Sequence, residues 1–376
     1  MAHYLLNIRL TKSCNADCTY CSSWQESPDS YMTRDLLINN LGYIFDSLHP
    51  AMNLKIDKVT IQYLGGEVLT IPVQELNEIV ESVRSFFSDR RIALVDGVQS
   101  NIIVSKRRLL NAMRLFSGRV GTSVDSSTGK RTLAGSSEAY SNRFDSNVAL
   151  LQPSSGSGVV FTVEDGDKTA CLDEYARAKE SGLPFTFRLV YKGGKEAVKF
   201  VSPDDYSFLL NRIFDDWFLK SSIPVEPLHD MVISRLQNRS TAACSSCNRQ
   251  STCAKEGLNI EPNGDLYLCM ETSDSGLYKL GNAQDKVFDF VTWSRLSQRD
   301  SAIKLECSSC RFYNSCKGGC LVESVQQGNG LYSRTPYCST YKSIFAKIDS
   351  AIESAGPSEV KAWLSQFHTN LHLGVA

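Results

Sequence analysis

Cys14-Asn15-Ala16-Asp17-Cys18-Thr19-Tyr20-Cys21 places three cysteines on one short loop, directly after an apolar run at residues 4–10. That run has the length and composition of a buried β-strand. Three thiolates at this spacing can hold three corners of a cubane iron–sulfur cluster, and the fourth iron would then have no ligand from the loop. A zinc knuckle or ordinary core thiols are the alternatives. Zinc usually takes four ligands, typically from paired cysteines, so we favour a cluster.

The composition is that of a globular protein with little net charge. The chain has 376 residues, of which 42% are hydrophobic and 22% charged, and its formal net charge is −1. This length suits one large and one small domain. Without long charged blocks we expect neither nucleic acid nor a membrane surface as a partner. The N-terminus lacks the features of a signal peptide and no run is long enough for a membrane helix, so we expect a cytoplasmic location.

Thirteen cysteines in such a chain favour metal ligation over disulfides, because the cytosol keeps thiols reduced. Three lie in the opening loop, Cys171 stands alone, and nine fall between Cys244 and Cys338. Two regions with different metal chemistry are therefore predicted. We expect Cys171, on a helix face, to be a small buried hydrophobe.

Short strand-like runs alternate with helix-like runs through the first 200 residues or so, which predicts an α/β fold with a parallel sheet wrapped in helices. Strands are expected at residues 4–10, 59–64, 92–98, 120–124, 159–163 and 185–191. Helices are expected at residues 32–48, 76–87, 106–116, 171–181 and 204–220, with terminal helices at 342–353 and 359–367. Six βα units suggest a partial (β/α)6 barrel of the TIM type, whose ligands bind at the carboxyl ends of the strands. We expect this barrel over residues 1–225, a cysteine-rich domain over 226–345 and C-terminal helices over 346–376.

The cysteine loop, with its aromatic Tyr20 before the third cysteine, resembles the signature of radical S-adenosylmethionine (radical SAM) enzymes. The resemblance implies that SAM chelates the open iron through its amino and carboxylate groups. Further SAM contacts are implied by a GGE motif that holds the methionyl amine, a polar segment near the ribose, an SxD motif and a downstream arginine. The residues matching these features are Gly65, Gly66, Glu67, Ser100, Ser123 and Arg131. Arg143 is the competing candidate for the arginine.

The C-terminal cysteines resemble the SPASM extension of radical SAM enzymes. The resemblance implies two auxiliary [4Fe-4S] clusters, and therefore three clusters in all. The first auxiliary cluster would take Cys247, Cys253, Cys269 and Cys320, and the second would take Cys307, Cys310, Cys316 and Cys338. A pair of zinc ribbons is the alternative, since Cys244-x2-Cys247 and Cys307-x2-Cys310 have zinc-like spacing.

The resemblance implies that the reduced first cluster breaks SAM into methionine and a 5′-deoxyadenosyl radical, which abstracts a hydrogen atom from an unactivated carbon. Our leading hypothesis is a maturase that forms a carbon–carbon, cyclophane or thioether cross-link in a ribosomally made precursor peptide. The alternatives are an anaerobic sulfatase-type maturase that makes formylglycine, a dehydrogenase or deoxygenase of a small molecule such as an aminosugar, and a non-enzymatic iron–sulfur electron carrier. Expected partners are the peptide or protein substrate and a reducing flavodoxin or ferredoxin system. The first strand begins near residue 4, so we expect no leader-binding module before it, and either a separate leader-binding protein or the catalytic body itself could bind the leader.

The residue after Cys269 separates two of these hypotheses. In sulfatase maturases an aspartate follows the matching cysteine and serves as the base, whereas this chain has Met270, which cannot take a proton. We therefore rank sulfatase maturation below peptide cross-linking. Glu271 is the nearest carboxylate and the candidate catalytic base, with a solvated surface glutamate as the alternative.

Overall fold

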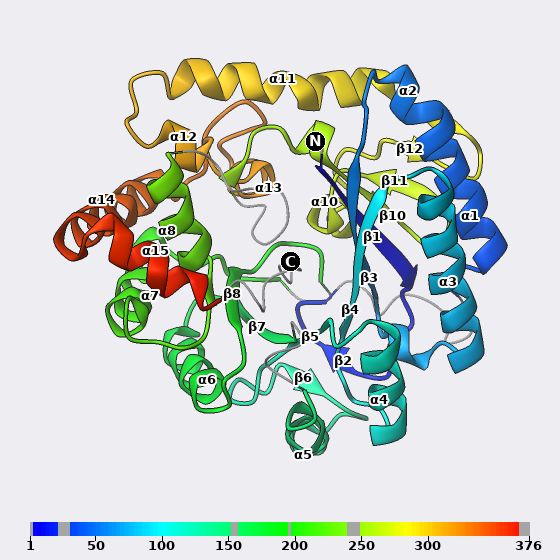
Figure 1. Cartoon of the computed structure of the whole chain (residues 1–376), viewed down its shortest axis with the longest axis horizontal. Coiled ribbons are helices and arrows are strands. Elements are labelled where there is room, and N and C mark those ends of the chain that lie inside the picture. Colours follow the sequence, from blue (N-terminus) through cyan, green and yellow to red (C-terminus); the bar gives the residue numbers. More distant parts are fainter. Residues whose placement is uncertain (1–2, 22–30, 152–156, 195–196, 239–248, 368–376) are drawn as a thin grey trace.

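The computed structural model describes residues 3–21, 31–151, 157–194, 197–238 and 249–367. A sheet of eleven strands forms the centre, in the order β13-β12-β11-β10-β1-β3-β4-β5-β7-β8-β9 (Figure 1). Neighbouring strands from β10 to β9 are parallel, and those from β10 to β13 are antiparallel. The protein therefore has a mixed α/β fold with a parallel sheet.

The strands of this sheet are β1 (His3–Thr11), β3 (Lys58–Gly65), β4 (Ala93–Ser100), β5 (Val120–Ser123), β7 (Gly158–Val163), β8 (Phe185–Leu189), β9 (Val225–Glu226), β10 (Gly257–Ile260), β11 (Asp265–Tyr267), β12 (Gly281–Asn282) and β13 (Val287–Phe288). A separate two-stranded ribbon pairs β2 (Asp17–Cys18) with β6 (Arg131–Thr132). All six strands predicted from the sequence are present, each within two residues of its expected ends. They follow one another across the sheet in chain order, as consecutive βα units do.

The helices are α1 (Arg34–Tyr43), α2 (His49–Ala51), α3 (Val73–Asp89), α4 (Lys106–Leu115), α5 (Ser137–Val148), α6 (Lys168–Glu180), α7 (Pro203–Trp217), α8 (Leu228–Gln237), α9 (Cys253–Glu256), α10 (Met270–Asp274), α11 (Phe290–Glu306), α12 (Tyr313–Cys316), α13 (Leu321–Gln326), α14 (Cys338–Ala355) and α15 (Pro357–Ser365). The expected helix over 32–48 is divided, because a π-helical turn, η2 (Ile44–Leu48), follows α1. A 3-10 turn, η3 (Val68–Thr70), follows β3. Eight helices have no counterpart in the sequence prediction: α2, α5, α8, α9, α10, α11, α12 and α13.

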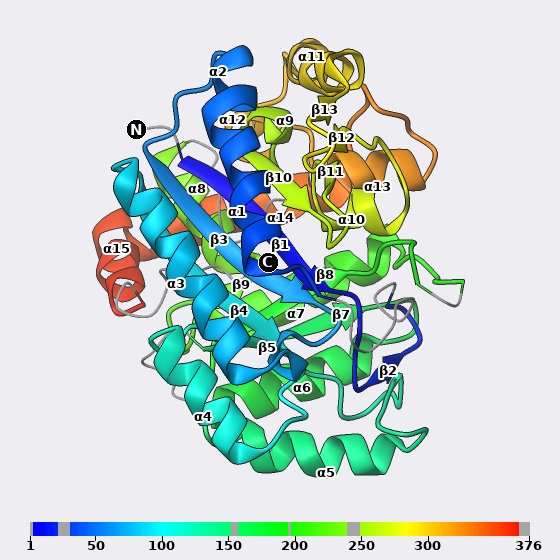
Figure 2. The same cartoon turned by 90° about the vertical axis from the view of Figure 1, so that its right-hand side faces the viewer.

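Burial explains why these segments form the core. Seven of the nine residues of β1 are buried, as expected for a strand covered on both faces. Helix α3 buries one stripe, Leu76, Ile79, Val80, Val83, Phe86 and Phe87. In Figure 2, α1, α3 and α4 run along one side of the sheet. Among the described residues, no helix combines the length and apolar character that crossing a membrane requires.

One strand pairing joins the two ends of the chain. Strand β10, from the cysteine-rich half, lies parallel to β1 and pairs Leu5 with Gly257 and Ile8 with Ile260. The sheet therefore continues across residue 225. Strand β11 runs back antiparallel to β10, and α10 then returns to the end of β1, where Asp274 lies 2.6 Å from Arg9.

Candidate functional site

A cavity of about 190 Å³ lies at the carboxyl ends of the parallel strands, and we call it the open cavity. Its wall carries all three thiols of the opening loop, Cys14, Cys18 and Cys21. Burial and the neighbouring Glu67, Cys18 and Cys21 raise the pKa of the Cys14 thiol to about 12. A metal bound here would therefore have to displace the proton from this thiol.

Several polar atoms at this cavity are buried and have no hydrogen-bond partner in the described chain: the Tyr20 hydroxyl, Gln99 Oε1 and Arg131 Nε. Buried polar groups are nearly always satisfied, and a polar ligand or water bound in this cavity would provide partners for these three atoms. SAM, with its amine, carboxylate, ribose and adenine, supplies donors and acceptors of this kind. The residues present therefore fit this cofactor.

Gly65 and Gly66 allow the end of β3 to pack closely against the backbone at Thr11 and Ser13. A Cβ atom on Gly65 would overlap the Thr11 carbonyl, and one on Gly66 would overlap the Ser13 carbonyl. Gly66 N donates to Thr11 O at 2.8 Å, which ties the end of β3 to the start of the cysteine loop. Both glycines also line the open cavity.

Glu67 is fully buried and already accepts three hydrogen bonds. Oε1 accepts from Leu69 N and the Ser100 hydroxyl, both at 2.8 Å, and Oε2 accepts from Asn101 N at 2.6 Å. Burial raises the pKa of the Glu67 carboxyl even though these hydrogen bonds oppose the shift. The carboxylate thus joins the ends of β3 and β4, whereas its glycine neighbours form the cavity wall.

The remaining predicted SAM contacts converge on the same cavity: Tyr20, Ser100, Ser123 and Arg131 all line it. The Arg131 guanidinium carbon lies 5.4 Å from the centre of the Tyr20 ring, and Arg131 Nη1 donates to the Tyr140 hydroxyl at 3.3 Å. Of the two arginines considered, Arg131 is buried and Arg143 is exposed on α5. The structure brings Arg131 to the cavity and leaves Arg143 outside it.

A second cavity, of about 80 Å³, collects the described cysteines that the resemblance assigns to the first auxiliary cluster: Cys253, Cys269 and Cys320. Cys247 and Cys244 lie outside the described residues. Burial raises the pKa of the Cys253 thiol to about 11. Val322 N donates to Cys320 Sγ at 3.3 Å, a contact of the kind that surrounds cluster sulfurs.

A third cavity, of about 90 Å³, holds Cys307, Cys310, Cys316 and Cys338, the four cysteines of the second predicted auxiliary set. They come from the ends of α11, α12 and α14 and the turn between α11 and α12. Burial raises the pKa of the Cys316 thiol to about 12. Cys171 is buried apart from the three sets.

The spacing of the thiols bears on the zinc alternative. Four thiolates around one tetrahedral zinc lie about 3.8 Å apart, given Zn–S bonds of about 2.3 Å. Within the described ranges, the one group of three ligand atoms all within 4.8 Å of one another is Glu226, His229 and Asp230, with no cysteine in it. A cubane spreads its thiolates over the corners of a larger body and suits the wider spacing better.

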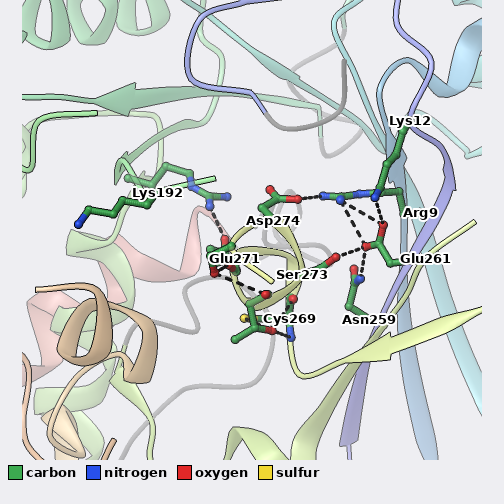
Figure 3. Close-up of polar contacts among 12 residues, drawn as sticks. Arg9, Lys12, Lys192, Asn259, Glu261, Cys269, Glu271, Ser273 and Asp274 are labelled. Atoms are coloured by element: carbon green, nitrogen blue, oxygen red, sulfur yellow. Dashed lines mark hydrogen bonds and ion pairs between the residues drawn. The ribbon is translucent and has the colours of Figure 1, made fainter. Parts of the chain in front are cut away.

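A buried ion network connects the cysteine loop to the loop of Cys269 (Figure 3). Arg9, near the end of β1, lies 2.6 Å from Asp274 and 3.3 Å from Glu261, and Lys12 lies 3.2 Å from Glu261. Glu261 also accepts from Ser273 and Asn259, each at 2.6 Å. Because Ser273 and Asp274 belong to α10, which begins next to Cys269, the network fixes the two thiol regions relative to each other.

Glu271 lines both the open cavity and the Cys269 cavity. It forms an ion pair with Arg188, near the end of β8. Burial alone would raise the pKa of the Glu271 carboxyl, but Arg188 and nearby hydrogen bonds hold it below its usual value. Arg188 was not singled out from the sequence. The sequence feature that could have identified Arg188 is its charge, which stands alone in the strand Phe185–Leu189 among apolar residues and one threonine.

Comparison with known proteins supplies the context. No model of a protein family matches the chain. A cysteine-type anaerobic sulfatase-maturating enzyme of Clostridium novyi is 21% identical over 355 residues, which cover 90% of this chain and 92% of that protein. A protein of the same description from Clostridium perfringens (strain 13) is 28% identical over 153 residues, covering 39% of this chain and 40% of that protein.

Two groups of solved structures share the fold. The structure of histidine-tagged anSMEcpe with bound AdoMet has a TM-score of 0.72 at 17% identity and covers 98% of this chain and 100% of that one. Streptococcus suis SuiB bound to S-adenosylmethionine has a TM-score of 0.57 at 14% identity and covers 90% of this chain and 77% of that one. These findings set aside the electron-carrier alternative. Together with the cysteine loop, they agree with the resemblance drawn from the sequence: the chain is similar over 90% of its length to an anaerobic sulfatase-maturating enzyme, and it shares the fold of two proteins solved with bound S-adenosylmethionine.

Proposed function

We propose that the protein is a radical SAM maturase with a SPASM extension that oxidises and cross-links a side chain of a ribosomally made precursor peptide. The single observation that carries the proposal is the convergence of three thiols, three unpartnered polar atoms and Glu271 on one open cavity. When bound at Cys14, Cys18 and Cys21, a [4Fe-4S] cluster supplies the electron that cleaves SAM to a 5′-deoxyadenosyl radical. The sheet serves as a partial (β/α)6 barrel over residues 1–225, followed by the SPASM segment over 226–345 and helices over 346–376.

The chain's own residues would bind and orient SAM. Tyr20, Gly65, Gly66, Ser100, Ser123 and Arg131 surround the cofactor in this proposal, and Glu67 acts by holding Ser100 and the Asn101 amide in place. Holding the reactive carbon against the substrate within this cavity also limits the access of water to the radical. Two auxiliary [4Fe-4S] clusters would occupy the other cysteine cavities, with Cys247 as the fourth ligand of the first.

Glu271 is the proposed proton acceptor after hydrogen-atom abstraction. It lies on the open cavity beside Met270, and Arg188 keeps it ionised and therefore able to accept a proton. A depressed pKa also makes Glu271 a weaker base, so it would work best on an acidic radical intermediate. We expect Glu271→Gln to keep forming 5′-deoxyadenosine while product formation falls. Full product yield from this variant would remove Glu271 from the mechanism.

Sulfatase-type maturation is the second candidate, and the match to the Clostridium novyi enzyme over 90% of this chain favours it. Met270 speaks against it, because no carboxylate occupies the position of the base of sulfatase maturases. SuiB, one of the structural neighbours, has been solved with a precursor peptide, and anSMEcpe with a Kp18Cys peptide. Both candidates therefore have a peptide or protein as substrate, and the SPASM resemblance favours such a substrate over an aminosugar.

A direct assay separates the two candidates. Anaerobically reconstituted protein is incubated with SAM and a flavodoxin or ferredoxin reductant, first with peptides encoded next to its gene, then with a synthetic peptide carrying a target cysteine. A cross-link removes two hydrogen atoms from the peptide, whereas formylglycine formation replaces the thiol by a carbonyl oxygen. Mass spectrometry distinguishes these outcomes. Peptide-independent turnover of a small molecule would contradict both, and a requirement for an added leader-binding protein would identify that partner.

A further inference from the structure

Tyr191 lies where the open cavity meets the first auxiliary cavity, and its side chain contributes to the walls of both. Its hydroxyl donates a hydrogen bond to Cys320 Sγ at a distance of 3.7 Å. The guanidinium carbon of Arg188 lies 5.8 Å from the centre of the Tyr191 ring. Tyr191 therefore contacts a predicted cluster ligand from the side on which the substrate would bind.

The segment that carries Tyr191 is held on three sides. Lys192 N donates to Gln326 Oε1 at 2.8 Å, and Gln326 Nε2 returns a bond to Lys192 O at 3.2 Å. Gln326 belongs to α13, the helix that begins immediately after Cys320. A Cβ atom on Gly193 would overlap Asp274, and one on Gly194 would overlap the backbone of Tyr20, so this turn packs tightly between α10 and the cysteine loop. The contact between Tyr191 and Cys320 is thus fixed by its surroundings.

We infer that Tyr191 is a positioning residue for electron transfer, which raises the reduction potential of the first auxiliary cluster by donating a hydrogen bond to the Cys320 thiolate. The inference rests on the proposed function. Reduction adds one negative charge to a cluster, and a hydrogen-bond donor to a ligand sulfur stabilises the more negative state. In the balanced step, the substrate has lost a hydrogen atom to the 5′-deoxyadenosyl radical. It then loses one proton to a base, and one electron to the oxidised cluster.

The test is Tyr191→Phe, which removes only the hydroxyl and keeps the ring beside Arg188. The change is made in the Cys14/Cys18/Cys21→Ala background, so that only the auxiliary clusters contribute to the spectrum. Potentiometry monitored by electron paramagnetic resonance should show one cluster with a more negative potential, by roughly tenfold in the equilibrium constant or about 59 mV for a one-electron couple. The other cluster should not change. Tyr332→Phe, at a tyrosine that is 41% exposed, is the matched control and should shift neither potential.

A second substitution, expected to shift the potential in the opposite direction, distinguishes the loss of the hydrogen bond from a simple loss of structure. Incorporation of 3-fluorotyrosine at position 191 keeps nearly the same size and makes a stronger donor, so the same potential should become more positive. In the chain with its three loop cysteines, Tyr191→Phe should keep forming 5′-deoxyadenosine and give less product per 5′-deoxyadenosine. Normal iron content with unchanged potentials in both variants would overturn the role of Tyr191 and leave the proposed function intact. Protein without iron at these cysteines would overturn both.

Discussion

The open cavity and the cavity of Cys307 and Cys338 both present cysteine thiols, but they differ in the number of thiols and in the groups around them. The first takes its three thiols from one short loop and surrounds them with buried polar atoms that have no partner in the described chain. The second takes four thiols from the ends of three helices and one turn. Three thiols leave one position of a cubane free to react, whereas four saturate it. From this comparison we propose that the loop site performs chemistry and that the helical site serves structure or electron transfer.

The largest expected effect comes from removing the three thiols of the open cavity. Replacing Cys14, Cys18 and Cys21 together with Ala should remove about a third of the iron, about four of twelve atoms per chain if each cubane holds four. Cleavage of SAM should be abolished. Iron analysis and quantification of 5′-deoxyadenosine measure both effects. Cys171→Ala, at a buried thiol outside the three sets, is the control and should keep its iron; 5′-deoxyadenosine from the triple variant would refute the assignment.

The four-thiol cavity of Cys307 and Cys338 is tested with Cys307→Ala combined with Cys310→Ala. We expect this pair to remove about a third of the iron as well, because a cubane does not persist on two of four thiolates. Cleavage of SAM should continue, since the open cavity is untouched. The intervening serines provide the control, because Ser308→Ala and Ser309→Ala alter exposed side chains. Zinc in place of iron in the unmodified protein would restore the zinc-ribbon alternative.

The link between the two regions is tested at Glu261. Glu261→Gln removes a buried charge from the Arg9 network and should lower the free energy of unfolding by about 3 kcal/mol at neutral pH. Burial by itself would raise the pKa of the Glu261 carboxyl. Arg9, Lys12 and hydrogen-bonding neighbours outweigh burial and lower this pKa in the folded state.

The sign of the pH dependence follows from that lowered pKa. The stabilisation by ionised Glu261 is present above the unfolded-state pKa and is lost as the pH falls through the folded-state pKa. Denaturant unfolding from neutral to acidic pH should show this loss in the unmodified chain and not in Glu261→Gln. The control is Asp35→Asn, which disrupts an exposed pair with Arg34 and should change stability little. Equal stability of Glu261→Gln and the parent at neutral pH would mean that the network does not hold the regions together.

The smallest expected effect concerns Glu67 and distinguishes a ligand contact from a structural one. If Glu67 holds the methionyl ammonium, Glu67→Gln should weaken SAM binding by roughly ten- to a hundredfold. If it serves chiefly the hydrogen bonds to Leu69, Ser100 and Asn101, the change should lower unfolding stability by about 1–3 kcal/mol. Calorimetric titration and thermal denaturation separate the two. Glu180→Gln, at an exposed residue, should change neither.

Local sequence signals were sufficient for the six predicted strands of the sheet. An apolar run at residues 4–10 or 159–163 excludes water in nearly any context, so its strand can be predicted from the sequence itself. The split of the expected helix over 32–48 escaped prediction, and so did eight helices, of which α5, α8 and α11 are the longest. Their packing partners are distant in sequence, and tertiary contacts override weak local preferences.

From the sequence alone follow the parallel α/β fold, the open three-cysteine loop and the radical SAM resemblance, because each is built from short motifs and runs that can be recognised locally. Only the tertiary structure decided that β10 joins β1, that Arg188 pairs with Glu271 and that Tyr191 contacts Cys320. These contacts join segments 83 to 252 residues apart. Such pairings depend on where the whole sheet brings its strand ends together, and no short window of sequence contains that information.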